Sequence, residues 1–185
     1  MRVKTGFSVQ ALNTRLQNAV NPLTAEKPTW GKFRDGDRVI VTQNNAYYNI
    51  CNGDVGVLHI RGEKPHRVAA LAVRGTLKTW QIDRGQGEYG IGHDDAPPPQ
   101  LALAYALTVH KSQGSQYDTV LMPVSMATAR MLYRNLLYTA ISRAGKEVIL
   151  VGSREALNTA MQCIPYPRRS KLVARTNLLR LGRSA

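Results

Sequence analysis

Eight consecutive residues, Thr108 to Ser115, carry the side chains best suited to contact a polyanion. They read TVHKSQGS and offer hydroxyls, an imidazole, an ammonium and an amide, while Gly114 allows close approach to the backbone. The run follows the apolar stretch Leu101–Leu107, which we interpret as a buried strand. We therefore expect these residues at the carboxyl edge of a sheet, where open α/β folds bind ligands. Composition alone leaves an ordinary polar loop open as the alternative.

Arg143 is the second candidate. The helical pattern of residues 127–142 stops at Gly145, which predicts that Arg143 lies in the last turn of a helix, where the helix dipole favours its charge. That structural role would explain an arginine at this position. A guanidinium can also reach across a cleft and stabilise charge on a transferring phosphoryl group. Both interpretations stay open on this residue alone.

The cysteines and histidines predict neither a disulfide framework nor a metal site. Cys51 and Cys163 are far apart in the sequence and belong to no CxxC pair, which fits a reducing cytosol. His93, Asp94 and Asp95 stand in a stretch rich in glycine and proline. Three consecutive side chains of a turn rarely converge on one ion, so we expect a solvated loop there.

The first half of the chain predicts a helix and a small barrel. Residues 7–20 place apolar side chains such as Leu12 and Leu16 at helical spacing, and Asn21 and Pro22 end this amphipathic pattern. Turn signals then separate short β-prone runs, which is typical of an antiparallel barrel. The four runs are Arg38–Gln43, Val55–Ile60, Arg67–Val73 and Leu77–Asp83.

The pattern changes after the triple proline at 97–99. In order, we predict strands at Leu101–Leu107, Thr119–Val124 and Glu147–Val151, and helices at 127–142 and Arg154–Cys163. The first two strands are continuous apolar runs, which indicates burial on both faces. Strands that alternate with helices favour a parallel sheet. The predicted fold is therefore α/β, with a leading helix in 1–27, an inserted barrel in 28–98, the rest of a split α/β domain in 99–163 and a basic tail in 164–185.

The chain is strongly basic but has the composition of a folded protein. Among 185 residues, 25 are Lys or Arg and 12 are Asp or Glu, giving a formal net charge of +13, while 43% are hydrophobic. This composition argues against a disordered polycation. No run approaches the roughly 20 apolar residues of a membrane helix, and no secretory pattern is present, so we expect a cytoplasmic protein without a membrane partner. No acidic residue follows Glu155, a pattern typical either of a tail that binds nucleic acid or an acidic partner, or of a solvated extension.

Four segments together resemble one family. Residues 101–124, LALAYALTVHKSQGSQYDTVLMPV, are similar to motif V of RecD-like superfamily 1 DNA helicases, and residues 136–152, LLYTAISRAGKEVILVG, to their motif VI and the next strand. Residues 33–58, FRDGDRVIVTQNNAYYNICNGDVGVL, resemble the Src-homology-3-like barrel inserted in the second RecA-like domain. Residues 4–22, KTGFSVQALNTRLQNAVNP, resemble the helix after motif IV. The resemblance implies an incomplete RecA-like sheet of the P-loop NTPase type with an inserted barrel.

The resemblance also implies roles for individual residues. Arg143 corresponds to the arginine that reaches the γ-phosphate of ATP, and Gln113 and Gly114 correspond to positions that link the nucleotide cleft to the DNA track. Tyr138 and Thr139 are expected to support motif VI. The expected contacts to single-stranded DNA are Thr108, His110, Lys111 and Ser112, with weaker candidates at Asn44, Asn45 and Tyr47, which turn and core roles in the barrel explain equally well.

The sequence departs from the family at the nucleotide site. It contains no G-x-x-x-x-G-K-[ST] and no acidic pair in a strand that could hold Mg²⁺. The resemblance therefore implies ATP and Mg²⁺ only together with a first RecA-like domain that carries the P-loop, in cis or in trans. We expect the C-terminal part of an ATP-dependent 5′-to-3′ DNA helicase, unable to hydrolyse ATP alone. The alternatives are a non-enzymatic single-strand-binding module and a helicase-derived interaction section of a conjugative relaxase or recombination complex.

Overall fold

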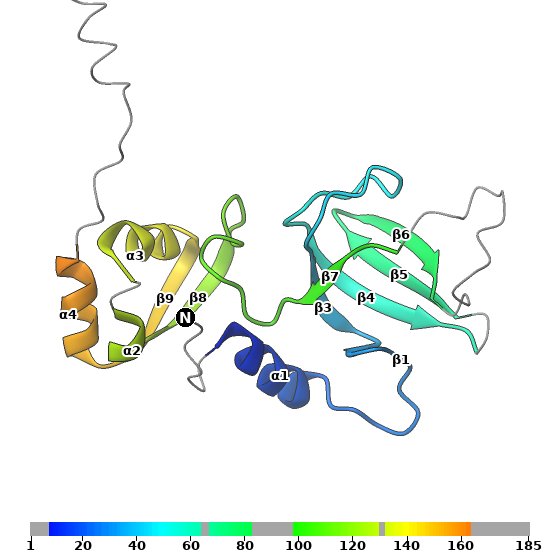
Figure 1. Ribbon diagram of the computed structural model, residues 1–185, viewed down its shortest axis with the longest axis horizontal. Helices are drawn as coiled ribbons and strands as arrows, with labels where there is room; N and C mark the ends of the chain where they lie inside the picture. Colours follow the sequence, from blue (N-terminus) through cyan, green and yellow to red (C-terminus); the bar gives the residue numbers. More distant parts are fainter. Residues whose placement is uncertain (1–7, 64–66, 83–97, 130–131, 164–185) are drawn as a thin grey trace, which may run out of the picture. The chain divides into compact units, whose positions relative to one another are not determined.

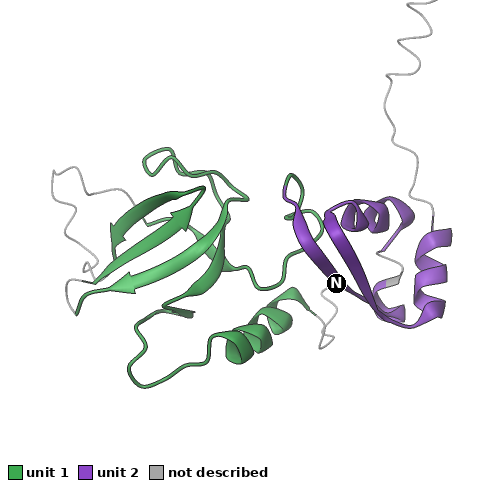
Figure 2. Cartoon of the chain, turned by 180° about the vertical axis from the view of Figure 1, so that it is seen from behind, with its two compact units in different colours: residues 1–114 green, residues 115–185 purple. Residues whose placement is uncertain are grey.

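The computed structural model describes residues 8–63, 67–82, 98–129 and 132–163. The chain divides into two compact units, residues 1–114 and residues 115–185 (Figure 2). No helix in the described ranges is long and apolar enough to span a membrane. The triplet His93–Asp95 and the basic tail at 164–185 lie outside the described residues.

The first unit is built on a five-stranded antiparallel sheet with the strand order β6-β5-β4-β3-β7 (Figure 1). Its strands are β3 (Asp37–Val41), β4 (Val55–Arg61), β5 (Val68–Val73), β6 (Thr76–Gln81) and β7 (Leu101–Leu103). The first four confirm the predicted strands to within one or two residues at each end. A short hairpin of β1 (Thr29–Trp30) and β2 (Phe33–Arg34) was not predicted, because two-residue strands have no periodicity to detect.

One face of this sheet and the hairpin enclose the core of the unit. Side chains that alternate along β3 and β5, such as Val39 and Leu71, are fully buried. The aromatic rings of the core contact one another, with Trp30 and Trp80 centroids 6.0 Å apart. Gly56 is required where β4 approaches β5, because a Cβ atom there would lie 2.2 Å from the carbonyl oxygen of Ala72.

The strand predicted at Leu101–Leu107 is shorter than expected and lies in a different sheet. β7 pairs antiparallel with β3, placing Leu103 opposite Val39 and Leu101 opposite Val41. The prediction of a parallel strand here is therefore wrong. An apolar run indicates only that a strand is buried. It does not indicate which strand will be its neighbour, and here that neighbour is β3. Both leucines of β7 pack against the barrel core.

The predicted leading helix is present as α1 (Val9–Val20), and the Ser8 hydroxyl caps it by accepting from the Ala11 N–H at 3.1 Å. The buried side of α1 is not the apolar one. Asn13 and Gln17 are 6% and 4% exposed, whereas Val20 is 68% exposed. An amphipathic helix ordinarily buries its apolar face. Here the amides are buried because they meet polar partners in the rest of the unit.

The second unit contains a parallel pair of strands, β8 (Tyr117–Val124) and β9 (Ala144–Gly152), which confirms the predicted parallel pairing. Three helices accompany the pair: α2 (Met126–Ala129), α3 (Arg134–Ile141) and α4 (Arg154–Gln162). α3 packs against both strands, and α4 packs against α2 and α3 (Figure 1). Ala156 and Ala160 of α4 are fully buried.

Two predictions for this unit are wrong in detail. The single helix expected at 127–142 is divided into α2 and α3, because Tyr133 is in an extended conformation at the start of α3 and the Arg134 N–H donates to the carbonyl of Cys163 after α4. The strand expected at Thr119–Val124 is buried on one face only. Met122 and Val124 are buried, but the neighbouring Leu121 is 64% exposed.

Candidate functional site

The sequence predicted that the loop at Thr108–Gly114 follows a strand of the parallel sheet. This prediction is wrong. The loop follows β7 of the barrel after four intervening residues and ends where β8 is about to begin. The loop is a compact turn that its own hydroxyls stabilise. Thr108 Oγ1 accepts from the Lys111 N–H at 3.3 Å, and Ser112 Oγ donates to the Val109 carbonyl at 2.8 Å. Thr108 and Ser112 therefore shape the loop, although both were predicted as phosphate contacts.

The other polar side chains of the loop are free to bind a ligand. His110, Lys111 and Gln113 are exposed, and their side chains form no hydrogen bond or ion pair within the described residues. Gly114 has a φ of 85°, a conformation that favours glycine, and no atom lies within 4 Å of where a Cβ would be. No acidic residue occurs between Tyr105 and Tyr117. The loop thus presents hydrogen-bond donors and positive charge without a neighbouring carboxylate in the sequence, which suits phosphate oxygens.

The barrel candidates divide into two turn-forming asparagines and one exposed ring. Asn44 Oδ1 accepts from the Asn52 N–H at 2.7 Å, and Asn45 Oδ1 accepts from the Tyr48 N–H at 3.3 Å. Both asparagines therefore have clear structural roles. Tyr47 is 56% exposed and meets the Tyr48 ring edge-on, with centroids 4.9 Å apart. An exposed ring braced in this way can stack on a nucleobase.

Arg143 lies beyond the end of α3 rather than in its last turn, because Ser142 is the C-cap. Its carbonyl accepts from the Tyr117 N–H at 2.9 Å, so its backbone already joins the start of β9 to β8. The half-buried guanidinium donates from Nη1 to the Ser115 carbonyl at 3.4 Å and from Nη2 to Ser142 Oγ at 3.2 Å. Nε is buried and has no hydrogen-bond partner among the described residues.

This arrangement leaves Arg143 able to contact a phosphate. A guanidinium carries five N–H donors, and the two that are used here make long bonds, so Nη hydrogens remain for anionic oxygens. Ser142 holds the group, because its hydroxyl donates to the Thr139 carbonyl at 2.9 Å and accepts from Arg143. Tyr138, predicted as support, is 73% exposed, and the Thr139 hydroxyl donates to the Asn135 carbonyl at 2.8 Å. The sequence analysis did not identify Ser142 as a partner of Arg143, although the two residues are adjacent in the sequence.

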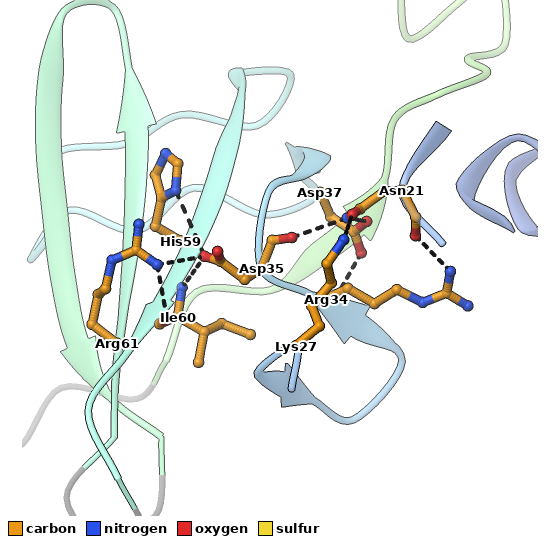
Figure 3. A network of polar contacts seen from close by, with 8 residues as sticks. All are labelled: Asn21, Lys27, Arg34, Asp35, Asp37, His59, Ile60 and Arg61. Carbon is orange, nitrogen blue, oxygen red and sulfur yellow. Dashed lines mark hydrogen bonds and ion pairs between the residues drawn. The ribbon is translucent and has the colours of Figure 1, made fainter. Parts of the chain in front are cut away.

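A buried polar cluster around Asp37 was also missed. The Asp37 side chain is fully buried, and Figure 3 shows Asn21, Arg34 and Asp37 of this cluster. Burying a carboxylate is costly unless hydrogen bonds replace the lost water. Asp37 accepts four, from Gln17 Nε2 at 2.6 Å, Asn21 Nδ2 at 2.7 Å, the Arg34 N–H at 2.8 Å and the Tyr105 hydroxyl at 2.8 Å.

Two sets of contacts explain the buried amide side of α1: Gln17 bonds to Asp37, and Asn13 bonds to Ala106. Asn13 Nδ2 donates to the Ala106 carbonyl at 2.8 Å, and Asn13 Oδ1 accepts from the Ala106 N–H at 3.0 Å. Burial raises the pKa of the Tyr105 hydroxyl above its ordinary value, and the hydrogen bond to Asp37 raises it further. Within the first unit, α1, the barrel and the segment before the loop at 108–114 are therefore joined by buried polar contacts.

Asp35 forms a second, more exposed network with β4 (Figure 3). Its Oδ1 accepts from the Ile60 N–H at 2.8 Å and lies 3.1 Å from Arg61 Nη1 and 3.7 Å from His59 Nδ1. Burial alone would raise the pKa of Asp35, but the hydrogen bond from Ile60 and the charge of Arg61 outweigh it. The net result is a pKa below the ordinary value.

The fold of this chain is similar to part of the fold of known helicase structures. A Pif1 helicase from Bacteroides, solved with ADP-AlF3 and ssDNA, matches 96% of this chain and 47% of its own, with a TM-score of 0.54 and 16% sequence identity. Another structure of Bacteroides Pif1, bound to ssDNA, matches 94% of this chain and 44% of its own, with a TM-score of 0.50 and 18% identity. The chain thus shares part of its fold with these helicases.

The sequence is similar to domains and proteins of the RecD-like helicases. Residues 12–71 match the ATP-dependent RecD-like DNA helicase SH3 domain, and residues 103–151 match the UvrD-like helicase C-terminal domain. The RecBCD enzyme subunit RecD of Mycobacterium tuberculosis is 32% identical over 149 residues, which are 80% of this chain and 23% of the relative. The ATP-dependent RecD2 DNA helicase of Deinococcus radiodurans is 35% identical over 170 residues, 85% of this chain and 22% of the relative.

The chain therefore carries a RecD-like helicase SH3 domain and a UvrD-like helicase C-terminal domain, and RecD and RecD2 proteins are among its relatives. It spans less than a quarter of the length of the two relatives.

Proposed function

We propose that this chain is the C-terminal part of an ATP-dependent 5′-to-3′ DNA helicase. In this proposal the loop at 108–114 binds the phosphates of single-stranded DNA, and Arg143 contacts the γ-phosphate of ATP held by a P-loop domain. The observation that carries the proposal is the exposed cluster of His110, Lys111 and Gln113, whose side chains have no partner within the described residues. The ssDNA in the Pif1 structures and the ATP-dependent activity in the name of the Deinococcus relative support it.

The DNA-binding role follows from the chemistry of the loop. Lys111 and His110 bring positive charge or hydrogen-bond donors to the backbone phosphates, and Gln113 adds an uncharged amide. Thr108 and Ser112 act indirectly, since their hydroxyls maintain the turn. Tyr47 is a separate candidate for stacking on a base.

Substitution of Lys111 tests this role. We expect Lys111→Ala to raise the Kd for a fluorescent oligothymidylate by about threefold to tenfold near 0.1 M salt, and to lower the salt slope by about 0.7, because one phosphate contact is lost. Fluorescence anisotropy across a salt series measures both values. Lys146→Ala is the matched control, since it removes the same charge from an ammonium that is already 2.8 Å from Asp118. Equal losses in the two variants would refute a specific role for the loop.

Arg143 is proposed for the nucleotide site. ATP supplies the phosphoryl group, and its transfer to water develops charge on the phosphate oxygens that a guanidinium can stabilise. Arg143 is positioned by Ser142 and by the Ser115 carbonyl, and both contacts are long enough to exchange for a phosphate oxygen. The chain has no P-loop sequence, so we propose that it hydrolyses ATP only with a domain that supplies one. We assign no residue of this chain to Mg²⁺.

The arginine is tested in a longer polypeptide that includes the P-loop domain. We expect Arg143→Ala to lower kcat for ssDNA-stimulated ATP hydrolysis by about 10³-fold or more, with the Kd for ssDNA changed less than about twofold. Arg143→Lys should recover little, because lysine keeps the charge but lacks the planar fork of donors. Arg154→Ala, at the exposed start of α4, is the control and should leave kcat unchanged. Normal turnover by Arg143→Ala would remove Arg143 from the nucleotide site.

A further inference from the structure

We infer that Asn13 and Tyr105 are positioning residues for the loop at 108–114. They fasten the segment directly before this loop to α1 and to the buried Asp37. The inference rests on the proposed function of the loop in DNA binding, and it adds the residues that hold the loop ready. It draws on contacts inside the first unit alone.

Three consecutive residues before the loop are each anchored to a different part of the unit. The Ala104 N–H donates to the Arg38 carbonyl of β3 at 2.8 Å. The Tyr105 hydroxyl donates to Asp37 at 2.8 Å. Ala106 exchanges two hydrogen bonds with the Asn13 side chain, at 2.8 and 3.0 Å. The last of these anchors lies two positions before Thr108, so the start of the loop has little freedom to move.

The anchor at Asn13 is specific in direction. Its amide meets the backbone of Ala106 as a strand partner would, donating to the carbonyl and accepting from the N–H. The amide nitrogen also donates to the Val9 carbonyl at 2.9 Å, which fixes the side chain on α1. An apolar side chain could fill the same space, but it would not set the register of the segment, because apolar contacts are non-directional.

The anchor at Tyr105 has a rigid base. Asp37 accepts from Gln17 of α1, from the C-cap residue Asn21 and from the backbone of β2, so it keeps three donors even without Tyr105. The hydrogen bond from Tyr105 is therefore not needed to compensate for the desolvation of the Asp37 carboxylate. Its hydroxyl instead ties the segment to a fixed point, and a loop that is already ordered loses less conformational entropy when it binds.

The test compares three substitutions in the 185-residue chain. Asn13→Leu removes the bonds to Ala106, and Tyr105→Phe removes only the hydroxyl. Gln17→Met is the control, because it removes one hydrogen bond to Asp37 and one to the Lys32 carbonyl but none to the segment before the loop. Hydrogen exchange of amides 107–114 is measured by mass spectrometry without DNA. The conditions are ones under which urea denaturation curves show that each variant is folded.

We expect exchange in this peptide to become about threefold to tenfold faster in Asn13→Leu and Tyr105→Phe and to stay unchanged in Gln17→Met. The Kd for oligothymidylate should rise by a similar factor in the first two variants only. Equal acceleration in all three variants, or a change that merely follows the loss of global stability, would show a general structural role and overturn the inference. Tyr105→Phe keeps the ring in place and remains informative if Asn13→Leu does not fold.

The two proposals fail in different ways. If Lys111→Ala weakens DNA binding while exchange in the loop is unchanged by Asn13→Leu and Tyr105→Phe, the positioning role is wrong and the DNA-binding loop stands. If exchange accelerates as expected but neither Lys111→Ala nor the anchor variants change the Kd, the loop is positioned but does not bind DNA, and the inferred purpose of the anchors is overturned with the proposed function.

Discussion

Asp35 and Asp37 are two positions apart in the sequence but have different surroundings. Asp37 is fully buried, and the hydrogen bonds that it accepts from the described residues come from uncharged donors. The Asp35 side chain is 24% exposed and contacts the charged Arg61 as well as the Ile60 N–H. Asp37 organises the interior of the unit, and Asp35 connects the β2–β3 turn to β4. Their different surroundings lead to a pH dependence that belongs to Asp35.

The pKa of Asp35 in the folded protein lies below 3.8, its ordinary value. A carboxyl group with a lowered folded pKa stabilises the protein above its unfolded pKa, and the stabilisation is lost as the pH falls through the folded value. We expect the free energy of unfolding of the wild type to fall as the pH drops from about 5 to about 3, and to fall less in Asp35→Asn. Urea denaturation across this pH range measures the difference. Asp118→Asn, whose carboxylate is 76% exposed, should follow the wild type.

At the scale of elements, β8 has two unlike faces. Met122 is 8% exposed and faces the packed side of the pair, whereas its neighbour Leu121 is 64% exposed. The alternation of side chains along a strand produces this contrast. Parallel strands ordinarily have both faces covered. In the described part of the second unit, α3 packs against both strands, while the β8 residue Leu121 is exposed.

The contrast predicts unequal costs for two adjacent substitutions. Met122→Ala should lower the free energy of unfolding by about 2 kcal/mol or more, because it removes packed atoms and leaves a cavity. Leu121→Ala should change it by less than about 0.5 kcal/mol, because the side chain is mostly in water. Chemical denaturation of the two variants provides the comparison. Similar losses would mean that Leu121 is covered in solution.

At the scale of the whole molecule, the net charge of +13 offers a competing explanation for DNA binding. Six of the positive charges follow Cys163, in a stretch with no acidic residue. A single-strand-binding module without catalysis could work through such a tail alone, by releasing counterions from phosphates. The helicase proposal places specific binding at the loop instead.

Truncation after Cys163 separates the two explanations, and it keeps α4, whose Ala156 and Ala160 are buried. If the tail adds only nonspecific contacts, we expect the salt slope to fall by at most about 4, with the fold-loss caused by Lys111→Ala unchanged. Anisotropy titrations of the full and truncated chains, each with and without Lys111→Ala, supply the four values. Abolished binding in the truncated chain would favour the charge-based module.

Much of the fold was predictable because its signals are local. The strands at 38–43, 55–60 and 67–73 combine β-prone residues with turn signals, and the structure has them with small shifts at their ends. The candidate site stays a prediction. Lys111 and His110 are exposed, as a binding role requires, whereas Thr108 and Asn44 accept backbone hydrogen bonds, and such partners cannot be deduced from residue type.

The sequence by itself determined the types of most elements, the charge and the family resemblance, since periodicity, turn residues and motif order are properties of neighbouring positions. The tertiary structure decided which sheet receives β7, which side of α1 is buried, and which groups hold Arg143. These outcomes depend on pairings between distant residues. Asn13 and Ala106 are 93 positions apart, and only the folded chain brings an amide on α1 to the backbone that leads into the loop.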